Sequence, residues 1–487
     1  MEEDIIAVET VKQRSVRGVL VLTGRTFLLQ AVSLIAQLFL FAYLGQYEFG
    51  VFAIVSAVVS FLTYFSDIGL AAALIQKKET PSETDLRTTF TIQQLLIFTL
   101  VGILFIFSKP IANHFNLSND GRILIFALGT SLILSSLKSI PSVLLERKLD
   151  FVKLVFPQIL ETVVYNIVLV ILAMKGMGLA SFSFAVVLRG IIGLAAIYYL
   201  QPWKIGFSLS IKTLKDLFKF GIPYQINSLL ATFKDDGITL VLGSILGPGG
   251  VGILTFAQKV ARYPLTFFMD NVTRVTFPAF SRLQDKPQDL ERSVTRSIFF
   301  ITLLVFPSLA GIVLLMPWVV EIVPKYSKWS AALLPLMFVS INFAFAAATT
   351  QLTNLLNAIG KIKITFYLMI MWTILTWVFI PFLALRYGVD GASVGYSLVG
   401  VSSIIAIYIA NKYVNFSITD SIIKPLLATI FMFIVLLFAR NTMEVNILNL
   451  QLLVILGIVV YSVSIISMVG MSLLEDAKRS FKTIFSK

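Results

Sequence analysis

The stretch GVLVLTGRTFLLQAVSLIAQLFLFAYLGQYEFG, residues 18–50, decides the fold of this chain. Its first part, residues 18–44, is apolar over more than the ~20 residues that a helix needs to cross the hydrocarbon core of a bilayer. It is too long for a signal peptide and runs into a second apolar stretch without a small-residue cleavage pattern. We therefore expect residues 18–44 to remain as the first transmembrane helix.

The rest of the chain repeats this pattern. Of its 487 residues, 57% are hydrophobic and 13% are charged, and the mean hydropathy is +0.90, which excludes a set of soluble domains. We predict an all-α polytopic membrane protein with about 14 transmembrane helices and short connections. The predicted spans are residues 18–44, 50–75, 90–108, 122–145, 153–175, 177–200, 217–245, 249–277, 297–320, 331–359, 363–385, 391–411, 422–439 and 450–471.

Basic residues in the connections predict the orientation of the chain. About 25 Lys and Arg residues fall on one side of the predicted spans and about 7 on the other, and the positive-inside rule assigns the richer side to the cytoplasm. An even number of spans then places both termini in the cytoplasm. The net charge of +13 is thus a topology signal, and it predicts no nucleic-acid partner.

An internal repeat is predicted from two short motifs. LGQYEFG, residues 44–50, and LGPGGVG, residues 246–252, share their glycine spacing at an offset of 202 residues, and Asp67 and Asp270 lie at nearly the same offset. Two parallel six-helix lobes related by a pseudo-two-fold axis along the membrane normal would follow, with two C-terminal helices outside the repeat. The alternative is a chance similarity between apolar helices. The expected parts are a cytoplasmic N-terminal tail (1–17), an N-lobe (18–200), a cytoplasmic linker (201–216), a C-lobe (217–411), two further helices (412–471) and a cytoplasmic C-terminal tail (472–487).

Ionisable residues inside the predicted spans are the first candidates for function, because a charge at the centre of a transmembrane helix costs about 2.5–3.5 kcal/mol on insertion scales. The cations are Arg25, Lys138, Arg189, Lys234, Lys259, Arg262 and Arg274, and the acids are Asp67, Glu161, Asp235, Asp236 and Asp270. Their surplus of positive charge predicts an anionic ligand such as a phosphate or diphosphate, for which Arg offers bidentate hydrogen bonds. The alternative is that pairs such as Lys259 with Asp270 only stabilise helix packing.

Polar residues also recur at helical spacing, in stripes that could line one aqueous cavity. Thr255, Lys259, Arg262, Thr266, Asp270 and Arg274 form the longest stripe. We expect Arg25, Lys234, Lys259, Arg262 and Arg274 to bind a diphosphate, Asp67, Asp235, Asp236 and Asp270 to act as cavity acids or ion-coupling groups, and Gln30, Gln37, Asn227, Thr350, Asn354 and Asn357 to contact sugars. The acids either hold the cations in place or bind a coupling Na⁺ or proton. The neutral polar residues either meet hydroxyl-rich ligands or join helices to one another.

Several chemistries are excluded by what the sequence lacks. It contains no cysteine and one histidine, which excludes disulfides, thiolate nucleophiles and most zinc sites. It also contains no P-loop and no His-Glu-x-x-His or Gly-x-Ser-x-Gly motif. We therefore expect no enzyme activity, no cofactor and no metal, and a transport step driven by a gradient or by downstream consumption.

Three stretches carry a resemblance to a known family. YLGQYEFGVFAI with FSDIGLAAALIQ (residues 43–54 and 65–76), FPAFSRLQ (residues 277–284) and NAIGKIK (residues 357–363) resemble the oligosaccharide flippases, Wzx-like or teichuronic-acid-exporter-like, of the multidrug/oligosaccharidyl-lipid/polysaccharide exporter superfamily.

This resemblance implies two lobes around a V-shaped cavity in a bacterial inner membrane, and transfer of undecaprenyl-diphosphate-linked oligosaccharides to the outer leaflet for polysaccharide synthesis. It implies a lipid-linked oligosaccharide, membrane lipid and the polysaccharide polymerase and export machinery as partners. Arg25 and Arg262 would be comparable to cavity arginines of the family.

Other functions remain open at this point. A small-molecule drug or cation antiporter of the same superfamily predicts a cavity rich in acids and aromatics and poor in Lys and Arg. A membrane-embedded glycosyl-transferring enzyme would need a sizeable outer loop, and a scaffold or uncoupled channel has little positive support. The flippase hypothesis requires that the in-span cations of both lobes converge on one aqueous cavity.

Overall fold

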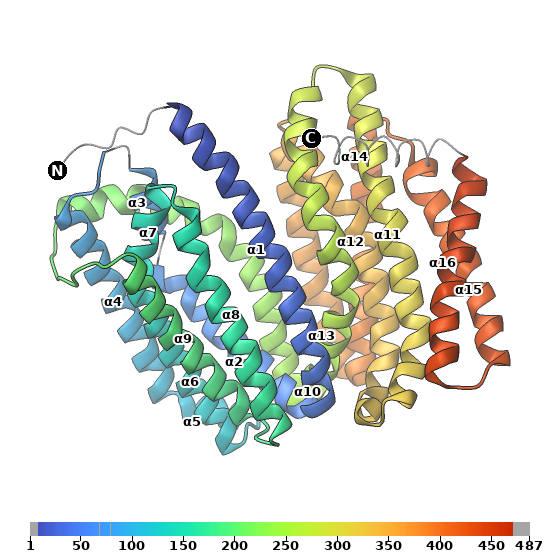
Figure 1. The fold of residues 1–487 in the computed structure, drawn as a ribbon, viewed down its shortest axis with the longest axis horizontal. Coiled ribbons are helices and arrows are strands. Elements are labelled where there is room, and N and C mark those ends of the chain that lie inside the picture. Colours follow the sequence, from blue (N-terminus) through green and yellow to red (C-terminus); the bar gives the residue numbers. More distant parts are fainter. Residues whose placement is uncertain (1–7, 68, 78, 471–487) are drawn as a thin grey trace. The chain divides into compact units, whose positions relative to one another are not determined.

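The computed structural model describes the backbone of residues 8–67, 69–77 and 79–470; the side chains of residues 8–23, 65–67, 216–218, 220–231, 270–271 and 274–275 lie outside the described part. Throughout the described backbone every regular element is helical (Figure 1). The elements are α1 (Val8–Tyr43), α2 (Gln46–Asp67), α3 (Leu70–Gln76), α4 (Glu83–Ile106), α5 (Ser108–His114), α6 (Asn119–Leu137), α7 (Ser139–Arg147), α8 (Phe151–Met174), α9 (Ala180–Leu200), α10 (Ile211–Leu283), α11 (Pro287–Ile322), η1 (Pro324–Ala332), α12 (Leu333–Ala358), α13 (Ile362–Val401), α14 (Ile404–Tyr413), η2 (Thr419–Ile423), α15 (Lys424–Thr442) and α16 (Ile447–Val469). The predicted all-α class is confirmed.

The helices are long and apolar enough to cross a membrane many times. Among the described residues, 12 helical segments meet this condition. Two of them contain a glycine with non-helical backbone angles within one helix, Gly247 in α10 with φ 67° and Gly388 in α13 with φ 61°, and a positive φ is a conformation that glycine adopts readily. Each of these glycines lies between two apolar helical stretches, so the segments correspond to the 14 spans expected from the sequence.

The chain divides into two compact units, Met1–Gly252 and Ile253–Lys487. In the first unit α8 packs against α1 and α9, and α6 packs against α4 and α9 (Figure 1). In the second unit α12 packs against α11 and α13, and α15 pairs with α16. The lobe boundaries expected from the repeat stay a prediction.

A proline separates α6 from α7. Pro141 has no backbone N–H, so the carbonyl of Leu137 loses the helical donor that residue 141 would supply. The hydroxyl of Tyr198 in α9 donates to this carbonyl instead, at 3.2 Å. The resulting break places Lys138 at the junction of the two helices. Both helices belong to the single membrane-crossing segment Asn119–Arg147, in agreement with the one span predicted here.

The two glycine motifs of the predicted repeat contact each other within the first unit. A Cβ atom on Gly50 would overlap the carbonyl oxygen of Pro248, and one on Gly252 would overlap the carbonyl oxygen of Gln46. The offset that relates Gly50 to Gly252 also relates Gln46 to Pro248. The two contacts are therefore equivalent under the repeat, which supports a duplication and explains why both motifs need glycine.

Asp85, near the start of α4, contacts both the Lys77 side chain and the segment that follows α9. Asp85 accepts from the Ser82 backbone N–H at 2.9 Å and pairs with Lys77 at 2.6 Å. Its other oxygen accepts from the Thr213 hydroxyl at 3.0 Å. Trp203 of the linker is buried against Phe90, with 5.1 Å between the ring centroids. The linker thus lies on α4.

Candidate functional site

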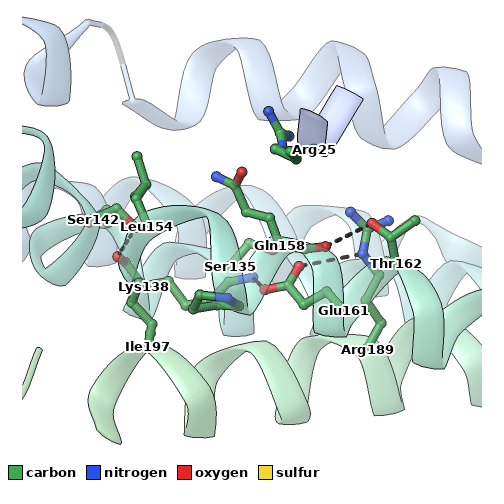
Figure 2. A pocket seen from close by; sticks show the side chains of 12 residues that line it. Arg25, Ser135, Lys138, Ser142, Leu154, Gln158, Glu161, Thr162, Arg189 and Ile197 are labelled. Carbon is green, nitrogen blue, oxygen red and sulfur yellow. Dashed lines mark hydrogen bonds and ion pairs between the residues drawn. The ribbon is translucent and has the colours of Figure 1, made fainter. Parts of the chain in front are cut away.

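A polar cavity of about 330 Å³ lies inside the first unit (Figure 2). Its lining comes from α1, the α6–α7 junction, α8 and α9. The charged lining residues are Arg25, Lys138, Glu161 and Arg189, and the polar ones are Ser135, Ser139, Ser142, Gln158 and Thr162. All of these helices belong to segments suited to crossing a membrane, so the charges lie where ionisable groups are rare and usually functional.

Glu161 is held between two of the three cations. Its Oε1 lies 2.6 Å from the Lys138 ammonium, and its Oε2 lies 3.5 Å from Nε of Arg189. The Glu161 side chain is 9% exposed and that of Lys138 is 16% exposed. The Arg189 guanidinium also lies 5.6 Å from the ring centroid of Tyr165, a cation–π contact. The buried carboxylate is therefore paired, as a buried charge must be.

Among the described residues, Arg25 has no such partner. Its Nε is buried, and within the described part of the chain no group accepts a hydrogen bond from it. The side-chain oxygen of Gln158 is likewise buried without a described donor. Figure 2 shows Arg25 on α1, with the Gln158 amide extending from α8 on the facing side. Because buried polar atoms are normally hydrogen-bonded, both atoms lack the partner that their burial normally requires.

Charge in the cavity therefore does not balance. Three cations face one carboxylate, which leaves a surplus of two positive charges. Uncompensated charge in a low-dielectric environment is unfavourable. A doubly charged phosphate-containing ligand would neutralise the surplus through charge-assisted hydrogen bonds.

Local packing gives Glu161 its position. A Cβ atom on Gly193 of α9 would overlap the Glu161 carboxylate. Glycine at this position lets the carboxylate lie against the α9 backbone, between Lys138 and Arg189. Pro157, one turn before Glu161, also lines the cavity.

Other predicted site residues of the first unit lie outside the lining of this cavity. Lys234 pairs with its sequence neighbour Asp235 at 3.4 Å, and the Asp235 side chain is 71% exposed. Asp236 accepts from the Ser60 hydroxyl at 2.7 Å, which joins α10 to α2. Gln30 is half-buried and Gln37 is buried on α1.

In the second unit the predicted residues lie on α10 and α12. Arg262 is exposed, and Lys259 contacts neighbours within the described chain. Thr350 donates to its own helix, to the Ala346 carbonyl at 2.8 Å, and the amide nitrogen of Asn354 is buried without a described acceptor. Asn357 is half-buried. The side chains of Asp67, Asn227, Asp270 and Arg274 lie outside the described residues.

Sequence reasoning selected Arg25 but not the three charged residues that the structure brings near it. Lys138, Glu161 and Arg189 were recognised only as charges inside spans. Their position inside spans marks them as unusual charges, but it does not predict that they pair with one another. That pairing depends on how three separate helices are rotated about their axes. The sequence does not mark Gln158 as a site residue, because a glutamine in a transmembrane helix is equally expected where it only forms hydrogen bonds between helices.

These features define a polytopic helical membrane protein with a charged cavity inside its spans. Residues 43–333 match the model of the polysaccharide biosynthesis protein family, and the chain belongs to this family. The family resemblance inferred from the sequence is thereby confirmed.

Curated relatives cover most of the chain. It is 23% identical over 411 residues to the lipopolysaccharide biosynthesis protein WzxC of Escherichia coli, with 82% of this chain and 81% of the relative covered. It is 24% identical to a putative O-antigen transporter of Shigella flexneri, over 73% of this chain and 87% of the relative. The succinoglycan biosynthesis transport protein ExoT of Rhizobium meliloti is also 24% identical, over 55% of this chain and 54% of the relative.

Solved structures share the fold. The lipid II flippase MurJ in an inward closed conformation matches with a TM-score of 0.74 at 18% identity, over 92% of this chain and 98% of that one. An inward-facing multidrug resistance MATE family transporter of the MOP superfamily matches with a TM-score of 0.60 at 14% identity, over 80% of this chain and 96% of that one.

Proposed function

We propose that this protein is a flippase that moves lipid-linked oligosaccharide units across a bacterial inner membrane for the synthesis of a surface polysaccharide. Membership of the polysaccharide biosynthesis family supports this role. The names of three relatives support it too, since they describe lipopolysaccharide biosynthesis, succinoglycan transport and O-antigen transport. We propose undecaprenyl diphosphate as the carrier, as the family resemblance implies.

The cationic cavity of the first unit is the observation that carries the proposal, and the convergence of the second-unit cations Lys259 and Arg262 on the same cavity stays a prediction. A diphosphate that joins a lipid to a sugar bears two negative charges, which equals the surplus left by Arg25, Lys138, Arg189 and Glu161. Arg25 would offer its guanidinium to the phosphates. The serine and threonine hydroxyls and the Gln158 amide would serve the sugar hydroxyls.

The proposed transfer follows from the solubility of each part of the substrate. Phosphates and sugars cannot enter hydrocarbon without losing their hydrogen bonds to water, whereas a polyprenyl tail can stay in lipid. A cavity exposed alternately to the two sides of the membrane would move the headgroup while the tail follows in the bilayer. Lys234, Lys259, Arg262 and Arg274 remain candidates for phosphate contacts, and Asp67, Asp235, Asp236 and Asp270 for coupling to Na⁺ or protons.

Deletion of the gene in its native host tests the proposal. We expect completed lipid-linked oligosaccharides to accumulate on the cytoplasmic leaflet and surface polysaccharide to be lost, with both restored by the wild-type gene. Leaflet location is measured by the accessibility of the sugar to an impermeant lectin in right-side-out and inverted vesicles.

Unchanged lipid-linked pools with altered sensitivity to drugs would contradict the flippase and favour the small-molecule antiporter. Accumulation of incomplete lipid-linked sugars would point instead to an enzymatic step before export.

A further inference from the structure

The three cations of the cavity are not equivalent. Lys138 and Arg189 are occupied by the two oxygens of one carboxylate, at 2.6 Å and 3.5 Å. Arg25 lies across the cavity without a described acceptor for its buried Nε. An entering anion thus meets one cation without a described partner and two cations that share the single negative charge of Glu161.

Glu161 competes with any ligand for Lys138 and Arg189. Because the Glu161 carboxylate belongs to the same chain, its effective concentration at the two cations is high, and a free anion must compete against it. A ligand with one negative charge can pair with Arg25 alone. A ligand with two linked phosphates can bind Arg25 with one of them and still supply a second charge to the remaining cations.

This difference matters in a membrane. The leaflet that would supply the substrate contains phospholipids whose single phosphodiester carries one negative charge, and these would compete for a cavity built only of cations. A carboxylate placed among the cations penalises such lipids more than it penalises a diphosphate, which is how a binding site gains specificity by repulsion.

We infer that Glu161 is a specificity-determining residue that makes the cavity reject monoanionic phospholipids and accept lipid diphosphates. This inference rests on the proposed function, since it concerns the choice of ligand at the same site. Gly193 supports the arrangement by leaving room for the carboxylate against α9.

Purified protein reconstituted into phosphatidylcholine vesicles tests the inference. The probe is a trace of acyl-labelled fluorescent phosphatidylglycerol, whose transfer between leaflets is followed by dithionite reduction. We expect wild-type protein to transfer this lipid no faster than protein-free vesicles, and Glu161→Gln to accelerate the transfer at least about tenfold. A parallel arm follows transfer of polyprenyl-diphosphate-linked N-acetylglucosamine with an impermeant lectin.

Two further variants separate competition from its alternatives. Lys138→Met with Glu161→Gln restores the wild-type surplus of two positive charges but removes the competing carboxylate, so it should also transfer phosphatidylglycerol. Asp85→Asn is the matched control, because Asp85 pairs with Lys77 at the same 2.6 Å with its side chain 8% exposed, outside the cavity lining. This control should reject the phospholipid as wild type does.

Three results would overturn the inference. Glu161→Gln that still rejects phosphatidylglycerol would show that the carboxylate does not select. If the double variant rejects phosphatidylglycerol as wild type does, the net charge of the cavity selects the ligand. If Asp85→Asn transfers phosphatidylglycerol, the loss of any buried ion pair is enough to cause the transfer. Wild-type protein that fails to transfer the diphosphate-linked sugar would instead count against the proposed function.

Discussion

Arg25 is the residue on which we expect ligand binding in the cavity to depend most directly. Its guanidinium has no carboxylate beside it among the described residues, whereas Lys138 and Arg189 share Glu161. A hydrogen bond to a charged group contributes about 1.5–3 kcal/mol. We expect Arg25→Ala to reduce polysaccharide export about tenfold or more at an unchanged protein level, because no internal ion pair is lost.

Export is measured as surface polysaccharide per molecule of membrane-inserted protein. Arg25→Lys should retain part of the activity, because it keeps the charge but not the bidentate geometry. Arg122→Ala is a control, since Arg122 contacts Ser108 and Phe126 outside the cavity lining. If Arg25→Ala lowers the amount of protein and leaves export per molecule intact, Arg25 has a packing role.

At the scale of elements, the approach of α8 to α9 depends on the missing side chain of Gly193. A Cβ at this position would meet the Glu161 carboxylate, and overpacking a well-packed interior typically costs about 1–3 kcal/mol. Gly193→Ala should therefore lower the thermal midpoint of the purified protein in detergent. It should also reduce export, because Glu161 must shift away from Lys138 or Arg189.

Gly102→Ala provides the comparison. Gly102 lies within α4, and a Cβ there meets nothing within 4 Å. Alanine is favoured over glycine in a helix by up to about 1 kcal/mol, so this variant should match or exceed the stability of wild type. Equal thermal midpoints for both variants would show that α8 and α9 adjust without strain.

For the whole molecule, the absence of cysteine in the sequence allows the predicted topology to be tested directly. Asp285 lies in the connection between α10 and α11, and Ser327 lies in η1; both are exposed. The distribution of basic residues predicts that the first faces the cytoplasm and the second faces outward. An impermeant maleimide should label Ser327→Cys in intact cells and Asp285→Cys only after the membrane is opened.

Each single-cysteine variant is to be checked for export, so that labelling reports on functional protein. The cysteine-free parent is the control for background labelling. Labelling of Asp285→Cys in intact cells, with protection of Ser327→Cys, would invert the predicted orientation and place both termini outside.

Much of the fold could be predicted because transmembrane helices are specified locally. The length and hydropathy of runs such as residues 18–44 and 450–471 are enough to predict transmembrane helices. The sequence does not predict where one residue changes the backbone inside a span. Pro141 interrupts the helix between α6 and α7 within the single membrane-crossing segment Asn119–Arg147, and Tyr198 of another helix donates to the Leu137 carbonyl.

The sequence by itself determined that the chain is a helical membrane protein of an oligosaccharide-exporting family, because burial in lipid requires long apolar helices and the family motifs are continuous. It also named Arg25 as a candidate. Only the tertiary structure decided that Lys138 and Arg189 share Glu161 while Arg25 stays open within the described chain. Such pairing depends on how helices distant in sequence rotate and approach, and a backbone contact such as that of Gly193 with Glu161 leaves no periodic signal in the chain.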